Sequence, residues 1–110
     1  MESPNEVVTL KQAKCLYVLG YDQRTIAYWT DAFLKRNRKH SLNFGKKLNY
    51  NEIFFSSEMD NYFSAPTIIE ALEWCEKVMG MKNDGSTYGN SLLNKWLSTL
   101  CEKYEYNYKS

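Results

Sequence analysis

Residues 64–80 read SAPTIIEALEWCEKVMG and carry the clearest structural signal in the chain. Thr67 is followed three residues later by Glu70, which is the pattern of a helix capping box, and the proline before the cap costs the helix no hydrogen bond. Apolar residues then recur every three or four positions until Gly80. This pattern predicts a helix over residues 67–79 with one buried stripe, made by Ile68, Leu72, Cys75 and Met79.

Two more helices are indicated on either side of this stretch. Thr9 and Gln12 form a second capping box, and Gly20 supplies the left-handed residue on which helices commonly end, so we expect a helix over residues 9–19. A last helix is expected from about residue 91 to 104. Its buried stripe consists of Leu93, Trp96, Leu97, Leu100 and Tyr104.

The middle of the chain favours strands. Residues 25–30 are rich in β-branched and aromatic side chains, although Ile26, Trp29 and Phe33 would also share a helical face. We interpret this region as a strand, a turn near residues 31–32 and a second short strand from Phe33. Residues 37–51 are expected to form an exposed loop or hairpin, and residues 53–55 a third strand. The tail, residues 105–108, is compatible with an edge strand.

These elements predict an α+β fold of about three helices packed on a small antiparallel sheet. A length of 110 residues is that of a single domain. Within it, residues 1–6 are expected to be frayed and residues 36–50 to form an exposed basic loop. Nothing in the sequence reaches the length of an apolar membrane span, and no leader is visible at the N-terminus, so we expect a cytoplasmic protein.

Charge is distributed unevenly along the chain. Residues 35–47 contain six Lys and Arg residues and no acid, although the whole chain has 14 basic and 13 acidic residues. The rest of the chain therefore has 14 − 6 = 8 basic residues against 13 acidic ones, a balance of −5. Such a local cationic segment on an acidic body favours contact with an anionic partner, nucleic acid above all.

Aromatic residues flank this basic segment, an arrangement that suits unstacked bases of a single strand. The alternative is a solvated loop whose charges serve solubility. The candidate nucleic-acid or partner-binding residues are Lys35, Arg36, Arg38, Lys39, His40, Phe44, Lys46, Lys47 and Tyr50. A second candidate surface is acidic and comprises a helix face with Glu70, Glu73 and Glu76 and the preceding Glu58 and Asp60; an ordinary solvent-facing side is its preferred interpretation.

Catalytic and metal chemistry find little support in the sequence. The three cysteines lie far apart in apolar helical stretches and are interpreted as reduced core residues rather than a disulfide framework. His40 is the only histidine, so neither a His/Cys metal site nor a base for a cysteine nucleophile is expected. Residues 85–89 contain two glycines without the lysine of a phosphate-binding loop. We expect no enzyme activity, no cofactor and no small-molecule substrate.

Several short motifs resemble a family of small, mostly uncharacterised proteins encoded by phages, prophages and mobile elements. The motifs are the early T-x-x-Q-A-K helix at residues 9–14, the pair Gly20-Tyr21, the segment 28–31 and the S-A-P-T helix start at residues 64–67, followed by Trp74. The resemblance covers about residues 8–80. It fails after Gly80, and the basic residues 35–47 are not part of the family pattern. It implies a phage or mobile-element origin and transfers no catalytic residue.

Size, charge and resemblance together favour a non-enzymatic inhibitor of a host defence system, similar to anti-CRISPR proteins. Its expected partner is an RNA-guided nuclease, the guide RNA of that nuclease, or both. Two alternatives stay open at this point: a general nucleic-acid-binding accessory protein, and a phage structural or assembly protein. The oligomeric state is not indicated.

Overall fold

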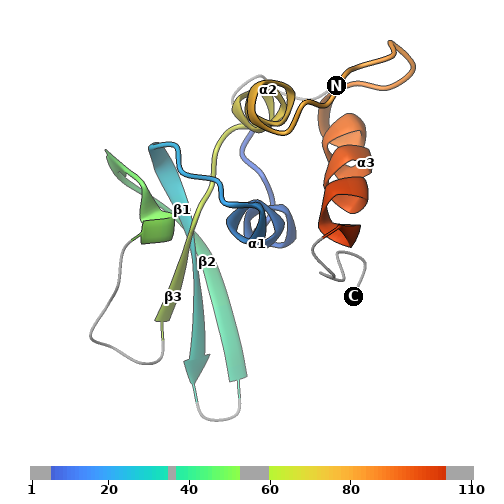
Figure 1. The fold of residues 1–110 in the computed structure, drawn as a ribbon. Helices are drawn as coiled ribbons and strands as arrows, with labels where there is room; N and C mark the ends of the chain where they lie inside the picture. The colour runs from blue at the N-terminus through green and yellow to red at the C-terminus, as the bar shows by residue number, and fades with distance from the viewer. Residues whose placement is uncertain (1–5, 35–36, 53–59, 104–110) are drawn as a thin grey trace.

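The computed structural model describes residues 6–34, 37–52 and 60–103, and Figure 1 shows their arrangement. Helix α2, Ile68–Val78, forms where the sequence predicts it. The Thr67 hydroxyl accepts from the Glu70 backbone N–H at 3.1 Å, and the Glu70 carboxylate accepts from the Thr67 N–H at 3.0 Å. Beyond the helix Gly80 takes a φ of 71°, which only glycine adopts without strain. The predicted capping box and stop are both confirmed.

Helices α1, Leu10–Leu19, and α3, Gly89–Glu102, complete the helical part. In α1 the Thr9–Gln12 capping box is present. Gly20, at φ 92°, closes this helix: its N–H donates to Tyr17 O at 3.1 Å, and the Tyr21 N–H donates to Leu16 O at 2.9 Å. These two bonds satisfy carbonyls that the end of a helix leaves without partners. Helix α3 begins two residues earlier than predicted.

A three-stranded antiparallel sheet forms the other part of the fold. It consists of β1, Thr25–Leu34, β2, Asn37–Leu48, and β3, Asp60–Ser64, in the order β2-β1-β3. The predicted α+β class is thereby confirmed. The predicted turn at residues 31–32 is wrong, because β1 continues through both positions. Residues 37–48 form a strand rather than the exposed loop expected over 36–50.

The third strand differs from the prediction as well. Strand β3 lies at residues 60–64, where no strand was expected, and the candidate at 53–55 lies outside the described residues. A 3-10 turn, η1, Tyr50–Glu52, follows the end of β2. The proposed edge strand at 105–108 also lies outside the described residues.

One face of the sheet packs against the helices. Trp29 of β1 lies opposite Leu42 of β2 and Phe63 of β3, and all three side chains are partly buried against the helical core. Ala27, on the same face of β1, is buried. The Trp29 indole N–H donates to Val8 O at 2.9 Å, which connects the sheet to the segment before α1. Because side chains alternate along a strand, the other face points away from the helices.

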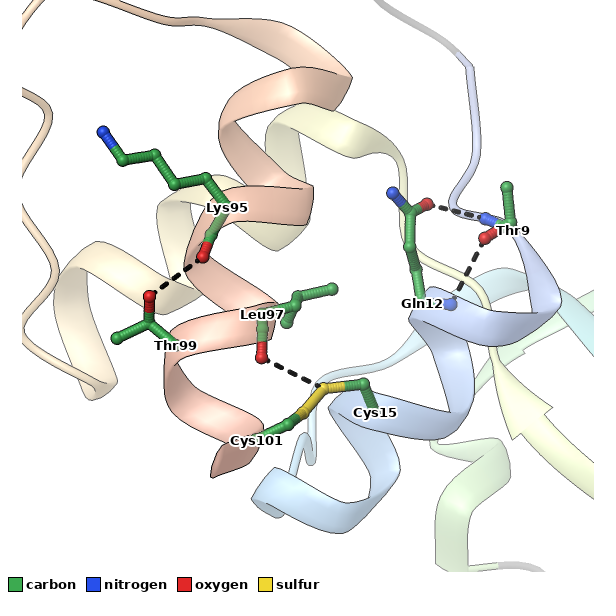
Figure 2. The surroundings of a disulfide bond; sticks show 7 residues. All are labelled: Thr9, Gln12, Cys15, Lys95, Leu97, Thr99 and Cys101. Atoms are coloured by element: carbon green, nitrogen blue, oxygen red, sulfur yellow. Dashed lines mark hydrogen bonds between the residues drawn. A yellow bond between two sulfur atoms is a disulfide. The ribbon is translucent and has the colours of Figure 1, made fainter. Parts of the chain in front are cut away.

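A buried amide joins the start of α1 to α3. Gln12 is only 1% exposed, and its side-chain oxygen completes the capping box by accepting from Thr9 N at 2.8 Å. Its side-chain nitrogen donates to the amide oxygens of Asn90 at 2.6 Å and Asn94 at 2.9 Å. Figure 2 shows Gln12 beside Thr9 at the first turn of α1. A residue predicted as a local cap therefore also holds two helices together.

A disulfide between Cys15 and Cys101 links α1 to the last turn of α3 (Figure 2). The expectation of three reduced cysteines is therefore wrong for this pair. The two residues are 86 positions apart in the chain, yet packing of α1 on α3 brings their Cα atoms to 6.6 Å, within the range that a disulfide spans. Cys75, in α2, is a free buried thiol, as expected.

The segment before α1 is fixed as far back as Glu6. The Glu6 carbonyl accepts from the Ile68 N–H at 2.8 Å, and Val7 forms a bridge with Thr67. The expectation of a frayed segment over residues 1–6 is thus wrong for residue 6, and residues 1–5 lie outside the described part. Among the described helices, none has both the length and the apolar character required to cross a lipid bilayer.

Candidate binding surface

The predicted basic segment lies mainly on β2 and does not form a loop. Lys35 and Arg36, between β1 and β2, lie outside the described residues. Positions 38–40, occupied by Arg38, Lys39 and His40, pair through the backbone with positions 31–33 of β1. The remaining candidates, Phe44, Lys46, Lys47 and Tyr50, lie near the other end of β2 and in the turn that follows it.

A β-bulge shapes this end of β2. Thr25 pairs with Leu48, but Ala27 pairs with Phe44, so residues 45–47 stand opposite a single residue of β1. A bulge bends its strand and redirects side chains. Lys46 and Lys47 are both exposed. Phe44 is 68% exposed, so most of its ring is not packed against the rest of the protein. Three of the predicted contact residues therefore do lie together on the surface.

Tyr50 differs from these residues, because its side chain is used for internal packing. It is 5% exposed, and its ring stacks on that of Tyr28 with centroids 4.2 Å apart. Its hydroxyl donates to the Lys46 carbonyl within the bulge. Burial, and to a lesser degree Tyr28, raises the pKa of this hydroxyl. Tyr50 thus supports the bulge and offers a partner almost no surface.

Next to the bulge lies a groove that the sequence did not reveal. It has two connected hollows of about 560 and 310 Å³, which share Arg24, Lys47 and Glu70. One wall comes from α2 and the other from the segment 21–27, with the end of β2 beside it. The larger hollow is lined by Tyr21, Asp22, Gln23, Arg24, Lys47, Glu70, Glu73, Trp74, Lys77 and Val78; the smaller adds Val7, Thr25, Ile26, Ala27, Phe44, Ala65 and Thr67.

The groove carries mixed charge over an aromatic floor. Tyr21 and Trp74 meet edge to face with ring centroids 5.2 Å apart. Burial, followed by the carboxylates of Glu70 and Asp22, raises the pKa of the Tyr21 hydroxyl, so this group stays protonated at physiological pH. The Trp74 indole N–H is buried and has no hydrogen-bond partner in the described part of the chain. The predicted acidic face thus lies partly in this groove, through Glu70 and Glu73.

The second face of the sheet is polar and aromatic. Thr30 of β1 and Ser41 of β2 share a hydrogen bond of 2.8 Å between their hydroxyls, and the Asn43 amide donates to both hydroxyls at 3.2 Å. Tyr28 lies beside Tyr62 of β3 with ring centroids 5.6 Å apart. These side chains hydrogen-bond or stack on one another, and Tyr28, Thr30, Asn43 and Tyr62 are only partly exposed.

Cys75 is a free cysteine in the described part of the chain. The Cys75 thiol is the candidate nucleophile that remains once the disulfide is formed, and burial, followed by Glu76, raises its pKa to about 12. A protonated, buried thiol is a poor nucleophile. Within residues 6–34, 37–52 and 60–103 no three His, Cys, Asp or Glu side chains come together as a metal site would require.

Comparison with protein-family models, with curated proteins and with solved structures found no match to this chain. The resemblance of residues 8–80 to small phage and mobile-element proteins stays a prediction. The surface itself presents an exposed aromatic ring and two lysines at a strand bulge, beside a groove of mixed charge.

Proposed function

We propose that this protein is a non-enzymatic inhibitor that binds an RNA-guided nuclease, and that the bulged end of β2 contacts the RNA of that complex. The observation that carries the proposal is the exposure of Phe44 together with Lys46 and Lys47. Lysines neutralise phosphates and release condensed counterions, whereas an exposed ring provides a face on which a base can stack. Single-stranded RNA presents both groups.

The biological setting rests on the resemblance to phage-encoded proteins. An inhibitor of host defence would act in the cytoplasm of the host cell, and blocking an RNA channel requires no bond-breaking chemistry. The sequence places four more basic residues at positions 35–39, which would lengthen the RNA contact. The rival class, a general nucleic-acid-binding protein, would use the same surface but would bind RNA tightly without a nuclease.

Charge reversal at the bulge tests the RNA contact. Lys46→Glu combined with Lys47→Glu should weaken binding of a labelled single-stranded RNA of about 16 nucleotides by tenfold or more, and reduce the slope of log K against log salt by about 1.4. The matched control is Lys82→Glu with Lys103→Glu, which changes net charge equally at two exposed positions on other elements. Equal loss in both double variants would attribute the effect to overall charge.

Inhibition is tested in a cleavage assay with a reconstituted RNA-guided, RNA-targeting nuclease. Addition of the protein at equimolar concentration should suppress cleavage, and the Lys46→Glu, Lys47→Glu variant should not. A quadruple change of Lys35, Arg36, Arg38 and Lys39 to Glu should also abolish inhibition while the domain stays folded. Tight RNA binding without inhibition would favour the general nucleic-acid-binding class; neither activity, with self-association, would favour an assembly protein.

A further inference from the structure

The outer edge of β2 presents backbone hydrogen-bonding groups in a regular row. Strand β2 is at the edge of the sheet, since the order is β2-β1-β3. The direction in which the N–H and C=O groups of β2 point can be derived from β1. The Ala27 carbonyl points toward β3, because it accepts from the Ala65 N–H at 3.0 Å. N–H and C=O groups alternate in direction along an antiparallel strand. Because Ala27 stands opposite Phe44, the Phe44 backbone points away from β1.

The same alternation applies to the rest of the strand. The register is unbroken from the pair Ala27–Phe44 to the pair Leu34–Asn37. The backbone groups of Arg38, His40, Leu42 and Phe44 therefore all point to the outer edge, and no described residue pairs with them. Such a row is a template for one more strand. In Figure 1 the lower part of the hairpin extends below the three helices.

We propose that this edge binds an extended, acidic segment of a protein partner by adding it to the sheet as a fourth strand. In this mode of recognition the main chain provides affinity and side-chain pockets provide specificity. The smaller hollow of the groove, about 310 Å³, is lined by Phe44 and Ile26, so it can receive an apolar side chain of the added strand. The inference goes beyond the RNA contact, which needs side chains at the bulge and not these amides.

Charge selects the occupant. In an antiparallel pair of two copies, outward-facing positions lie opposite each other. A register centred on position 42 places position 38 opposite 46, and both positions are basic in the sequence; like charges directly opposite each other destabilise a strand pair. An acidic strand reverses the sign of the same interactions. The lysines and the bulge thus discourage self-pairing while they favour an anionic partner.

Amide hydrogen exchange provides the test, with a capped peptide of alternating Glu and Val, about eight residues long, as the probe. At about ten times its Kd, the peptide should slow exchange roughly tenfold at Arg38, His40, Leu42 and Phe44. Positions 39, 41 and 43, whose amides face β1, should change little. A Lys–Val peptide of the same length should give no protection. The alternating pattern is measured on the unmodified protein, so this test does not depend on whether a variant folds.

Leu42→Pro supplies the variant, with Leu42→Val as its matched control. Proline removes one outward N–H, which an edge strand tolerates, and should abolish the peptide effect while RNA binding is kept; valine keeps the N–H and should keep both. Three results would overturn the inference. These are equal protection by the Lys–Val peptide, edge protection that rises with protein concentration alone, and shifts caused by RNA with none caused by peptide. Loss of RNA binding in the Lys46→Glu, Lys47→Glu variant bears on the proposed function separately.

Discussion

At the scale of single residues, the bulge depends on the close approach of Gly45 to a tyrosine. A Cβ at position 45 would lie 3.1 Å from the Tyr50 hydroxyl oxygen and 3.5 Å from a ring carbon of Tyr28. Gly45→Ala should therefore displace Tyr50 from the Lys46 carbonyl. We expect a loss of about 1 kcal/mol in the free energy of unfolding, measured in urea, because one buried hydrogen bond is weakened.

A double-mutant cycle separates this contact from the general effect of replacing glycine. In a Tyr50→Phe background the hydroxyl is absent, so Gly45→Ala should be neutral or stabilise by up to about 0.5 kcal/mol through loss of unfolded-chain entropy. Equal costs of Gly45→Ala in both backgrounds would show that the Tyr50 hydroxyl is not the group it meets.

Cys75 gives a pH dependence at the same scale. Its thiol pKa rises from 9.0 to about 12, because burial disfavours the thiolate and Glu76 adds to the effect. The folded state thus binds this proton more tightly than the unfolded state. The resulting stability is fully present below about pH 9 and is lost as the pH rises toward 12, by up to about 1.4 kcal/mol per unit.

The measurement is urea unfolding between about pH 8 and 11 for the wild type and Cys75→Ala. Removal of the thiol costs a constant amount from lost packing but should make the alkaline decline shallower. The pKa of the Tyr21 hydroxyl is also raised, so its contribution to stability falls at alkaline pH in both proteins. That contribution therefore cancels in the difference between them. Parallel curves for the two proteins would contradict the assignment.

At the scale of secondary-structure elements, Gln12 distinguishes a local cap from a connection between helices. Thr9→Ala removes one capping bond and should cost about 1 kcal/mol. Gln12→Ala also leaves the partly buried side-chain oxygens of Asn90 and Asn94 without this donor, so about 2–3 kcal/mol is expected. Urea unfolding of both variants measures the difference. Equal costs would show that the link from α1 to α3 adds nothing to the cap.

The helices were predictable from sequence because their signals are local. The capping boxes at Thr9 and Thr67 and the stops at Gly20 and Gly80 act within a few residues, and the structure has all of them. The bulged hairpin was not predictable in the same way. Residues 31–34 carry no turn-forming Gly or Pro to set the length of β1, and register depends on partners distant in sequence.

The candidate binding surface was predictable only in part, for the same physical reason. The exposure of Phe44, Lys46 and Lys47 follows from a basic run that no core could bury. The burial of Tyr50 does not follow from it, because it depends on Tyr28, 22 positions earlier in the chain. The groove escaped prediction entirely, since α2 and the segment 21–27 meet only through the tertiary fold.

At the scale of the whole molecule, the Cys15–Cys101 disulfide governs stability. It closes a loop of 86 residues, for which the chain-entropy relation gives about 4–5 kcal/mol relative to the reduced protein. Unfolding in urea with and without a strong thiol reductant should show this difference, and the Cys15→Ala, Cys101→Ala variant should be insensitive to the reductant. A wild type whose midpoint ignores complete reduction would contradict the expectation.

The disulfide must persist if the protein acts in a host cytoplasm, as proposed, because thiol pools there keep most cysteines reduced. Both cysteines are fully buried, so a reductant reaches the sulfurs only when α1 and α3 separate. We therefore expect reduction of the folded protein to be slow and to accelerate in mild denaturant. Mass spectrometry of alkylated samples follows it directly.

In mechanical terms, the disulfide closes residues 15–101 of the oxidised chain into a ring. A force applied to its ends is carried through the sulfur–sulfur bond, so the sheet, α2 and the hairpin that we assign to partner binding bear almost no load. Only the residues outside positions 15–101 can be drawn out. After reduction the ring opens and releases roughly 290 Å of chain at about 3.4 Å per residue. A translocating unfoldase that pulls on the chain would thus have to pass two chain segments through its channel at once, or stall until a thiol reduces the disulfide.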